Sequence, residues 1–366
     1  MIDDGLKLTV YFGERDRVSR HGPGGERLGD EFLADTLSEI YERHRLRSSL
    51  VMRGVEGFGI KHHLHTDRLL TLSEDLPLVS VAVDTSARVR EALREVEALR
   101  FDGLVTLERA RILADEIKAQ ELPAALTETT KLTVYVGRHE RVGGRRVYEA
   151  VVDLLHRSGV PGAIVLLGVD GTAHGRRQRA RFFAANAHVP TMIIAVGPRP
   201  KMTELLPELG ALLPRPLMTL ERVTVCKREG QVLCAPEALP ATDPSGLGVW
   251  QKLMVYSTEQ AQSDGHPLHH RLIRSLRRAG AAGATSLRGL WGYAPGELPH
   301  GDSFWQLRRR LPILTVVVDT PQRIHEWFGV VDQVTGASGL VTSEMVPAFR
   351  ATGPEVHRGG LHLARL

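Results

Sequence analysis

The chain has 366 residues, of which 42% are hydrophobic and 25% are charged, values typical of folded globular domains that exclude a disordered chain. Its formal net charge is +4, but basic residues alternate with acidic ones and form no clustered patch, so no nucleic-acid partner is predicted. The chain has two cysteines, Cys226 and Cys234, too few to predict a disulfide framework. It shows no leader before Leu6 and no apolar run of about 18 residues, so we predict a cytoplasmic protein without a membrane span.

One strand pattern opens three stretches of the chain. Lys-Leu-x-Val-Tyr occurs at residues 7–11, 131–135 and 252–256, and its alternation predicts strands with two different faces. In the first stretch Leu8 and Val10 are expected to meet helices, whereas Lys7, Thr9 and Tyr11 lie on the opposite face. Apolar residues at helical spacing follow each strand, in residues 33–44, 147–154 and 268–276.

A glycine-bearing strand, a polar loop and a strand that begins near a proline come next in each stretch. The glycine and the proline are nearly equally spaced in all three: they are Gly54 and Pro77, Gly168 and Pro190, and Gly289 and Pro312. A second helical pattern and a last strand complete each stretch. This repetition predicts three copies of one structural unit.

The order strand, helix, strand, strand, helix, strand is typical of the ferredoxin-like arrangement, in which both helices cover one face of a four-stranded antiparallel sheet. We therefore predict an α+β protein of three ferredoxin-like (βαββαβ) modules, at residues 1–115, 129–226 and 249–348. The uncovered sheet faces must be buried, so the modules are expected to pack around a pseudo-threefold axis within one monomer.

Each module carries a lysine on its first strand and a glutamate on its last strand. These strands are antiparallel neighbours in the predicted fold, so the two residues are expected to lie across from each other on the inter-module face. The pairs are Lys7 with Glu108, Lys131 with Glu221, and Lys252 with Glu344. We interpret them as ion pairs that orient the modules; the alternative is an anion site that uses the lysines.

The motifs of the first module together resemble one family. They are Lys-Leu-x-Val-Tyr at residues 7–11, Arg-Gly-Val-Glu-Gly-Phe-Gly at 53–59, His65-Thr66, and Leu-Ser-Glu-Asp-Leu-Pro at 72–77 before a strand that ends in Asp84-Thr85. The set is similar to the PII-like family known as domain of unknown function one hundred and ninety. The first module matches throughout, and the other two match in framework.

The resemblance implies a PII-like pseudo-trimer that signals without catalysis and holds effectors in clefts between modules. Mobile loops are expected at residues 58–73, 172–186 and 293–306. The implied effector is a small anion such as an adenine nucleotide. The implied partner is a regulated protein such as a membrane transporter, with a fluoride exporter as the candidate because genes of the family often neighbour those of small fluoride exporters.

The best-preserved cleft is expected at the first module, and no cofactor is expected. Its predicted ligand-binding residues are Arg53, Glu56, Gly57, Phe58, Gly59, His65, Asp67, Asp84, Thr85 and Arg109. The second module departs from this pattern, since Thr172-Ala173 and Gly197-Pro198 replace Phe58-Gly59 and Asp84-Thr85. The third has Tyr293-Ala294 in place of Phe58-Gly59.

The glycines of the first module do not form a dinucleotide fingerprint, because a polar loop follows Gly59 where that motif needs a helix. They are instead interpreted as allowing close backbone approach, either of a ligand or of the next module. Both interpretations remain open.

Histidines at positions 62, 63 and 65 are candidate metal ligands because they are close in sequence. No carboxylate or thiol lies at a spacing characteristic of metal ligands, so no metal site is predicted. His65 and His300 are equivalent in position, as are Asp67 and Asp302. No nucleophile elbow is present, so an enzyme is not expected. The alternative functions are a structural or adaptor protein without a ligand and a divalent-metal-binding, trimer-like protein.

Overall fold

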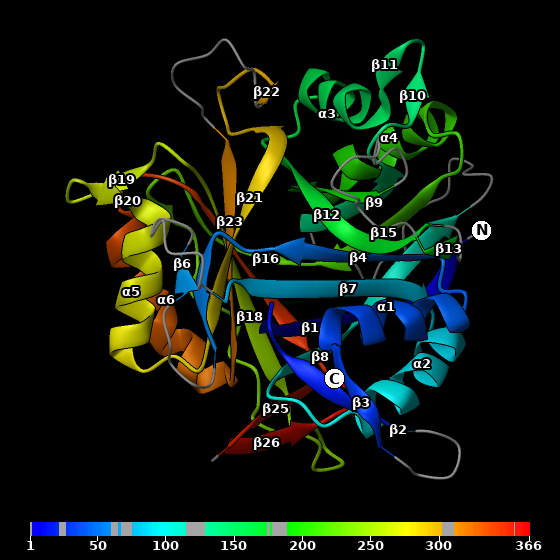
Figure 1. The fold of residues 1–366 in the computed structure, drawn as a ribbon. Helices are drawn as coiled ribbons and strands as arrows, with labels where there is room; N and C mark the ends of the chain where they lie inside the picture. Colours follow the sequence, from blue (N-terminus) through cyan, green and yellow to red (C-terminus); the bar gives the residue numbers. More distant parts are fainter. Residues whose placement is uncertain are drawn as a thin grey trace.

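The computed structural model describes residues 2–21, 27–59, 65–66, 75–114, 129–173, 176–177, 189–301, 311–354 and 356–366. Three pairs of helices, α1/α2, α3/α4 and α5/α6, lie on different sides of a central body of strands (Figure 1). Within the described residues, no helix combines the length and the apolar character needed to cross a bilayer.

Each repeat contributes four long strands and two helices in the same order. Repeat 1 consists of β1 (Ile2–Gly13), α1 (Leu33–Arg43), β4 (Ser48–Arg53), β7 (Pro77–Thr85), α2 (Ser86–Ala98) and β8 (Gly103–Ala114). Repeat 2 consists of β9 (Thr129–Gly137), α3 (Val147–Arg157), β12 (Ala163–Ala173), β14 (Pro190–Pro198), α4 (Arg199–Leu212) and β15 (Leu217–Arg222). Repeat 3 consists of β18 (Trp250–Thr258), α5 (Leu268–Ala279), β21 (Ala284–Tyr293), β23 (Pro312–Asp319), α6 (Pro321–Thr335) and β24 (Leu340–Val346).

Short strands complete the architecture. They are β5 (Glu56–Phe58), β6 (His65–Thr66), β13 (Arg176–Arg177), β16 (Thr224–Arg228), β17 (Gln231–Val232), β22 (His300–Gly301), β25 (Ala348–Gly353) and β26 (Val356–Gly360). Three small hairpins precede the first helix of each repeat: β2 (Arg17–His21) with β3 (Arg27–Phe32), β10 (Arg141–Val142) with β11 (Arg145–Arg146), and β19 (Gln262–Ser263) with β20 (His266–Pro267).

The predicted fold class, three ferredoxin-like modules forming a PII-like pseudo-trimer, is wrong. The strands do not form three separate four-stranded sheets but one continuous sheet of 20 strands. Eight of them close into an antiparallel ring in the order β1, β7, β4, β12, β14, β9, β15, β8 and back to β1. Main-chain hydrogen bonds, and not side chains alone, therefore join the repeats.

Strand length explains this correction. The last strand of repeat 1, β8, runs from Gly103 to Ala114, and its end pairs with β15 of repeat 2. In the same way β16 pairs with β24 and β25 pairs with β8, so the last strand of every repeat extends onto another repeat. Unpaired strand edges favour association, and these extensions pair them within one chain.

The two faces of each strand meet different cores. Leu8 and Val10 pack against the helices of repeat 1, and repeats 2 and 3 have equivalent cores beneath their own helices. The opposite faces line the interior of the sheet, where residues of all three repeats, including Val81, Ile194 and Val316, form a shared central core. The long strands of the repeats, such as β7, β9, β14 and β23, are thus buried on both faces.

The glycine-bearing strand of each repeat crosses onto another repeat. Gly57 pairs with Thr285, Gly171 with Leu50, and Gly292 with Ile164, so repeat 1 reaches repeat 3, repeat 2 reaches repeat 1, and repeat 3 reaches repeat 2. A Cβ atom on Gly171 would lie 2.1 Å from the carbonyl oxygen of Ser49. Of the two roles left open for these glycines, the described residues therefore show close approach of a neighbouring repeat.

The residue after the crossing glycine anchors two of the three crossings. Phe58 is buried in the core of repeat 3, and Tyr293 is buried in the core of repeat 2, where its hydroxyl donates to the Val160 carbonyl at 2.8 Å. Repeat 2 has Thr172 instead, whose Oγ1 lies 2.9 Å from Ser49 Oγ. The sequence differences between repeats thus change the contact that stabilises each crossing, which is a buried aromatic side chain in two crossings and a pair of hydroxyl groups in the third.

Replacement of Gly171 by alanine should destabilise the protein by about 3 kcal/mol, because the new methyl group must displace the backbone at Ser49 and Leu50. Urea unfolding at equilibrium measures this change.

Gly329→Ala is the matched control. Gly329 is exposed within α6, and a Cβ there meets nothing within 4 Å, so alanine should stabilise the protein by about 0.5–1 kcal/mol. Equal effects of the two substitutions would contradict the assigned role of Gly171.

Candidate functional site

Six charged side chains from the three repeats form a closed ring, the central ion ring, made of Lys7, Lys131, Lys252, Glu108, Glu221 and Glu344. Within each repeat the lysine Nζ lies close to a glutamate oxygen: 3.0 Å for Lys7–Glu108, 2.8 Å for Lys131–Glu221 and 3.1 Å for Lys252–Glu344. The structure therefore brings together the lysine and glutamate that the sequence analysis paired.

Each lysine also bonds to the glutamate of another repeat, which sequence reasoning missed. Lys131 Nζ lies 2.5 Å from Glu344, Lys252 Nζ lies 2.5 Å from Glu108, and Lys7 donates to Glu221. Charges of opposite sign thus alternate around the ring. All six side chains are at most 9% exposed.

Strand register places these residues. Lys7 and Glu108 are directly paired between β1 and β8, as are Lys131 and Glu221 between β9 and β15, and Lys252 and Glu344 between β18 and β24. Because the neighbouring apolar residues face the helices, the lysine and glutamate must face the interior. Each charge there needs its partners, since water cannot replace them.

The lysines decide the protonation state of the glutamates. Burial alone would raise the pKa of Glu221, but Lys131 and Lys7 outweigh it and lower that pKa from 4.5 to about 2. Lys252 and Lys7 likewise overcome burial and lower the pKa of Glu108. Glu221 and Glu108 are therefore ionised at neutral pH.

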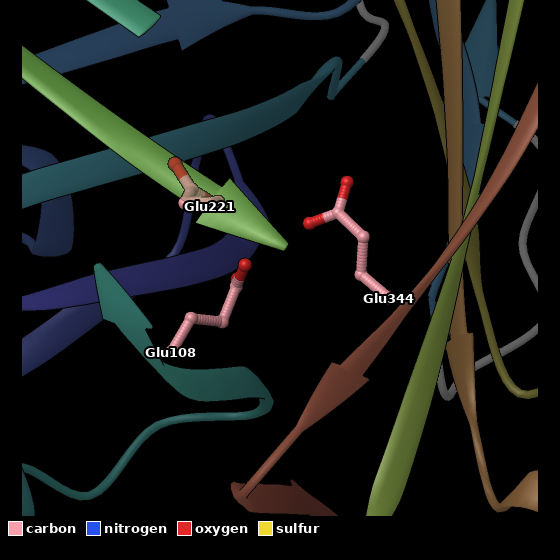
Figure 2. A group of neighbouring side chains, drawn as sticks. All are labelled: Glu108, Glu221 and Glu344. Atoms are coloured by element: carbon pink, nitrogen blue, oxygen red, sulfur yellow. The ribbon is translucent and has the colours of Figure 1, made fainter. Parts of the chain in front are cut away.

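Figure 2 shows Glu108, Glu221 and Glu344 converging from β8, β15 and β24. One oxygen of each lies within 4.8 Å of the others, a spacing that could suit a metal ion. Each carboxylate, however, already bonds to two ammonium groups. A cation would have to displace the lysines, so the donor set fits a neutral structural ring and not a metal site.

A cavity of about 980 Å³, the central cavity, lies over the ion ring. The three ring glutamates form part of its lining, and the rest comes from β1, α2, β8, β15, β16, β24, the segment before β18 and the C-terminal residues. Five arginines line it: Arg90, Arg109, Arg111, Arg222 and Arg365. Outside the ring, Asp4 and Glu237 are the lining carboxylates among the described residues.

Two of these arginines have carboxylate partners. Arg111 pairs with Asp4, and Arg222 lies 3.9 Å from Glu237. For Arg90, Arg109 and Arg365, no described carboxylate lies within ion-pair distance. Partial burial, Arg90 and Arg365 all lower the pKa of Arg109, whose Nη2 donates to the Ala364 carbonyl at 2.5 Å. The cavity thus has excess positive charge.

The other predicted ligand-binding residues do not gather in one cavity. Arg53 pairs with Glu14 at 2.8 Å, and buried Glu56 lies 2.6 Å from His270 Nδ1 of repeat 3. Asp84 accepts from the amides of Arg47 and Thr85 where β7 meets α2. These contacts position strands and a helix.

Phe58, Gly57 and Gly59 lie where repeat 1 crosses repeat 3. Phe58 and Gly59 line a cavity of about 260 Å³ there, the crossing cavity, together with Asp16, Asp75 and Asp102. Its lining contains no lysine or arginine among the described residues, so it suits an anion poorly. His65 pairs with Gly57 through β6, whereas positions 62, 63, 67, 174 and 302 and most of the predicted mobile loops lie outside the described residues.

Sequence reasoning included Arg109 but missed Arg90, Arg365 and His270. Arg90 is exposed on α2, and Arg365 follows the last repeat, so neither stands in a motif. His270 could have been singled out from the sequence, because it follows His269 directly at the start of the third module's first helix, α5.

Replacement of Lys131 by methionine should destabilise the protein by about 3–5 kcal/mol, because Glu221 and Glu344 would lose a shared counter-charge while buried. Urea unfolding measures the loss. Arg145→Met is the control, since Arg145 pairs with Asp153 at the surface and its loss should change the stability far less. Similar losses for both variants would contradict the importance of the ring.

Acid should weaken the fold through Glu221. Because its folded pKa of about 2 lies below its ordinary value of 4.5, its contribution is fully present above pH 4.5 and is lost as the pH falls to about 2. The loss should reach about 3 kcal/mol. Unfolding free energies measured across this range test the slope, which Glu221→Gln should reduce; an unchanged slope would refute the assignment.

Comparisons with known proteins agree with the repeat structure. The family model DUF190, described as "Uncharacterized ACR, COG1993", matches residues 5–112, 129–225 and 250–348. A UPF0166 protein of Aquifex aeolicus (strain VF5) is 26% identical over 95 residues, which cover 26% of this chain and 88% of the relative. A second UPF0166 protein of the same strain is 26% identical over 83 residues, 23% of this chain and 85% of the relative.

Among solved structures, aspartate kinase from Synechocystis aligns with a TM-score of 0.24 and 10% identity. The alignment covers 94% of this chain but 52% of that one, and a score this low carries no argument about fold or function. The three family matches together span most of the chain, and the UPF0166 relatives belong to the same PII-like family. The chain therefore belongs to the PII-like family DUF190.

Proposed function

We propose that this protein is a non-enzymatic PII-like regulator that binds a small anionic effector in the central cavity between its repeats. The observation that carries the proposal is the arginine lining of this cavity: Arg90, Arg109 and Arg365 face a shared space and have no described carboxylate partner. Arginine binds phosphate and carboxylate groups through paired hydrogen bonds, so such a cluster favours an anion over a neutral ligand.

The size of the cavity supports a ligand such as an adenine nucleotide. Pockets for small molecules typically enclose about 300–1,000 Å³, and the central cavity has about 980 Å³. The ion ring beneath it is neutral as a whole, since three lysines balance three glutamates. The ring therefore does not cancel the charge of the arginines.

The C-terminal residues offer a route from binding to signalling. Arg109 donates to the Ala364 carbonyl, and the Arg365 amide donates to Asp243 at 2.8 Å. An anion that takes the Arg109 guanidinium competes with the first of these bonds, so bound and free states differ in how residues 364–365 are held. A ligand with different affinity for the two states shifts their populations.

The proposed partner that reads this change is a regulated protein such as a membrane transporter, with a fluoride exporter as the candidate suggested by the family resemblance. The crossing cavity is the weaker candidate for the effector, because its carboxylates would repel an anion.

Isothermal titration with ATP, AMP, inorganic pyrophosphate and sodium fluoride tests the proposal on the full chain. We expect at least one polyanion to bind and Arg109→Gln to weaken it about ten- to one-hundred-fold, since a charge-assisted hydrogen bond contributes about 1.5–3 kcal/mol. Arg365→Gln should weaken it similarly while its backbone bond to Asp243 stays intact.

Arg274→Gln is the control, because Arg274 is exposed on α5 and does not line the cavity. Its affinity should equal that of the wild type. If no anion gave a measurable heat of binding, the result would contradict the sensor function and favour the adaptor alternative. Equal weakening by Arg274→Gln would show that binding reflects overall charge.

A further inference from the structure

The two cysteines of the chain meet across one hairpin. Cys226 lies in β16, and Cys234 follows β17, which pairs with β16. The amides of Leu233 and Cys234 both donate to the Cys226 carbonyl, at 2.8 Å and 3.3 Å. The backbone therefore holds Cys226 and Cys234 side by side.

Their side chains also lie together. Cys226 Sγ is 3.8 Å from the Thr224 carbonyl oxygen, and Cys234 Sγ is 3.4 Å from the next carbonyl, that of Val225. The neighbouring Cys234 side chain contributes to the raised pKa of Cys226. Both cysteines are free thiols, and they differ in access: Cys226 is buried in the core of repeat 3, whereas Cys234 is exposed.

We propose that Cys226 and Cys234 form a reversible intramolecular disulfide, which makes this hairpin a redox modification site for low-molecular-weight disulfides. The Cys234 amide lies 3.3 Å from the Cys226 carbonyl oxygen, so the two backbones are close enough for a disulfide to form without large backbone movement. The proposal does not depend on the ligand of the central cavity.

The exchange takes place in two steps. The Cys234 thiolate attacks one sulfur of the small disulfide, forms a mixed disulfide and releases one thiolate. The Cys226 sulfur, after losing its proton to water, then attacks Cys234 Sγ and releases the second thiolate. Two protein thiols are oxidised, and one small disulfide is reduced to two thiols.

Cys234 carries out the first step, the attack on the small disulfide, because Cys234 is exposed whereas the Cys226 thiol is buried and protonated. Burial and the neighbouring Cys234 raise the pKa of Cys226 to about 12, so Cys226 stays protonated at neutral pH. An external disulfide reaches Cys234 first, and Cys226 then acts as the resolving thiol from within the hairpin.

The hairpin ties repeat 2 to repeat 3. Lys227, next to Cys226, donates to Asp332 Oδ1 at 2.5 Å and to Thr335 at 3.0 Å, both on α6. The segment after Cys234 continues to Glu237, whose carbonyl accepts from Gln251 at 3.1 Å. A disulfide would fasten the start of this segment to β16.

To test the proposal, the full-length protein is treated with oxidised glutathione. Its products are then measured by thiol titration, intact mass and peptide mapping. The wild type should lose both thiols, gain no glutathionyl group, yield one cross-linked peptide containing both cysteines, and regain both thiols in dithiothreitol. A stable glutathione adduct on Cys234 with Cys226 still free, or disulfide-linked dimers, would overturn the proposal.

Single variants separate the two steps. In Cys226→Ala the glutathione adduct on Cys234 should persist, because no resolving thiol remains. In Cys234→Ala the Cys226 thiol should stay unmodified in the native protein and react only in urea, which also shows that the variant is folded. Rapid modification of native Cys234→Ala would contradict the assigned order of attack.

Discussion

Alternating charge in the central ion ring constrains the rest of the structure. Lys131 pairs with Glu221 of its own repeat and with Glu344 of the next, so each buried charge has one partner in its own repeat and one in another. Removing one member leaves two buried side chains of the ring without one of their partners. The ring thus links the three repeats through buried ion pairs, and the strand crossings link them through main-chain pairing.

Local sequence patterns predict which face of a strand each residue occupies and that the structural unit is repeated. Alternation along β1 and β8 predicts that Lys7 and Glu108 face away from the helices, and repetition predicts the same for the other repeats. The closed ring of strands could not be predicted this way, because the partner of residues 111–114 is a strand more than 100 residues later, Leu217–Arg222, which no local pattern specifies. Asp84 shows a second limit: an aspartate between a strand and a helix satisfies backbone amides as readily as it binds a ligand.

The site was predictable only in part, for a related reason. Arg109 stands in a repeated strand, so it belonged to a recognisable motif, whereas Arg365 lies after the last repeat and reaches the central cavity only through the folded chain. The crossing and central cavities also differ in charge, since the described lining of the first contains carboxylates without arginine, whereas five arginines join the carboxylates in the lining of the second. Fusion of three repeats allows such divergence, because each copy is free to change its own side chains.

The direction of the crossings bears on how the chain folds during synthesis. Phe58 is made early, yet it is buried among Leu253, Leu272 and Val341 of the repeat made last. Until the ribosome delivers that repeat, an aromatic side chain and the strand edge of β5 have no partner, and contacts so distant in sequence form slowly. We therefore expect repeats 1 and 3 to close late in synthesis, and a nascent chain that stalls before repeat 3 to expose Phe58 and the edge of β5 to aggregation.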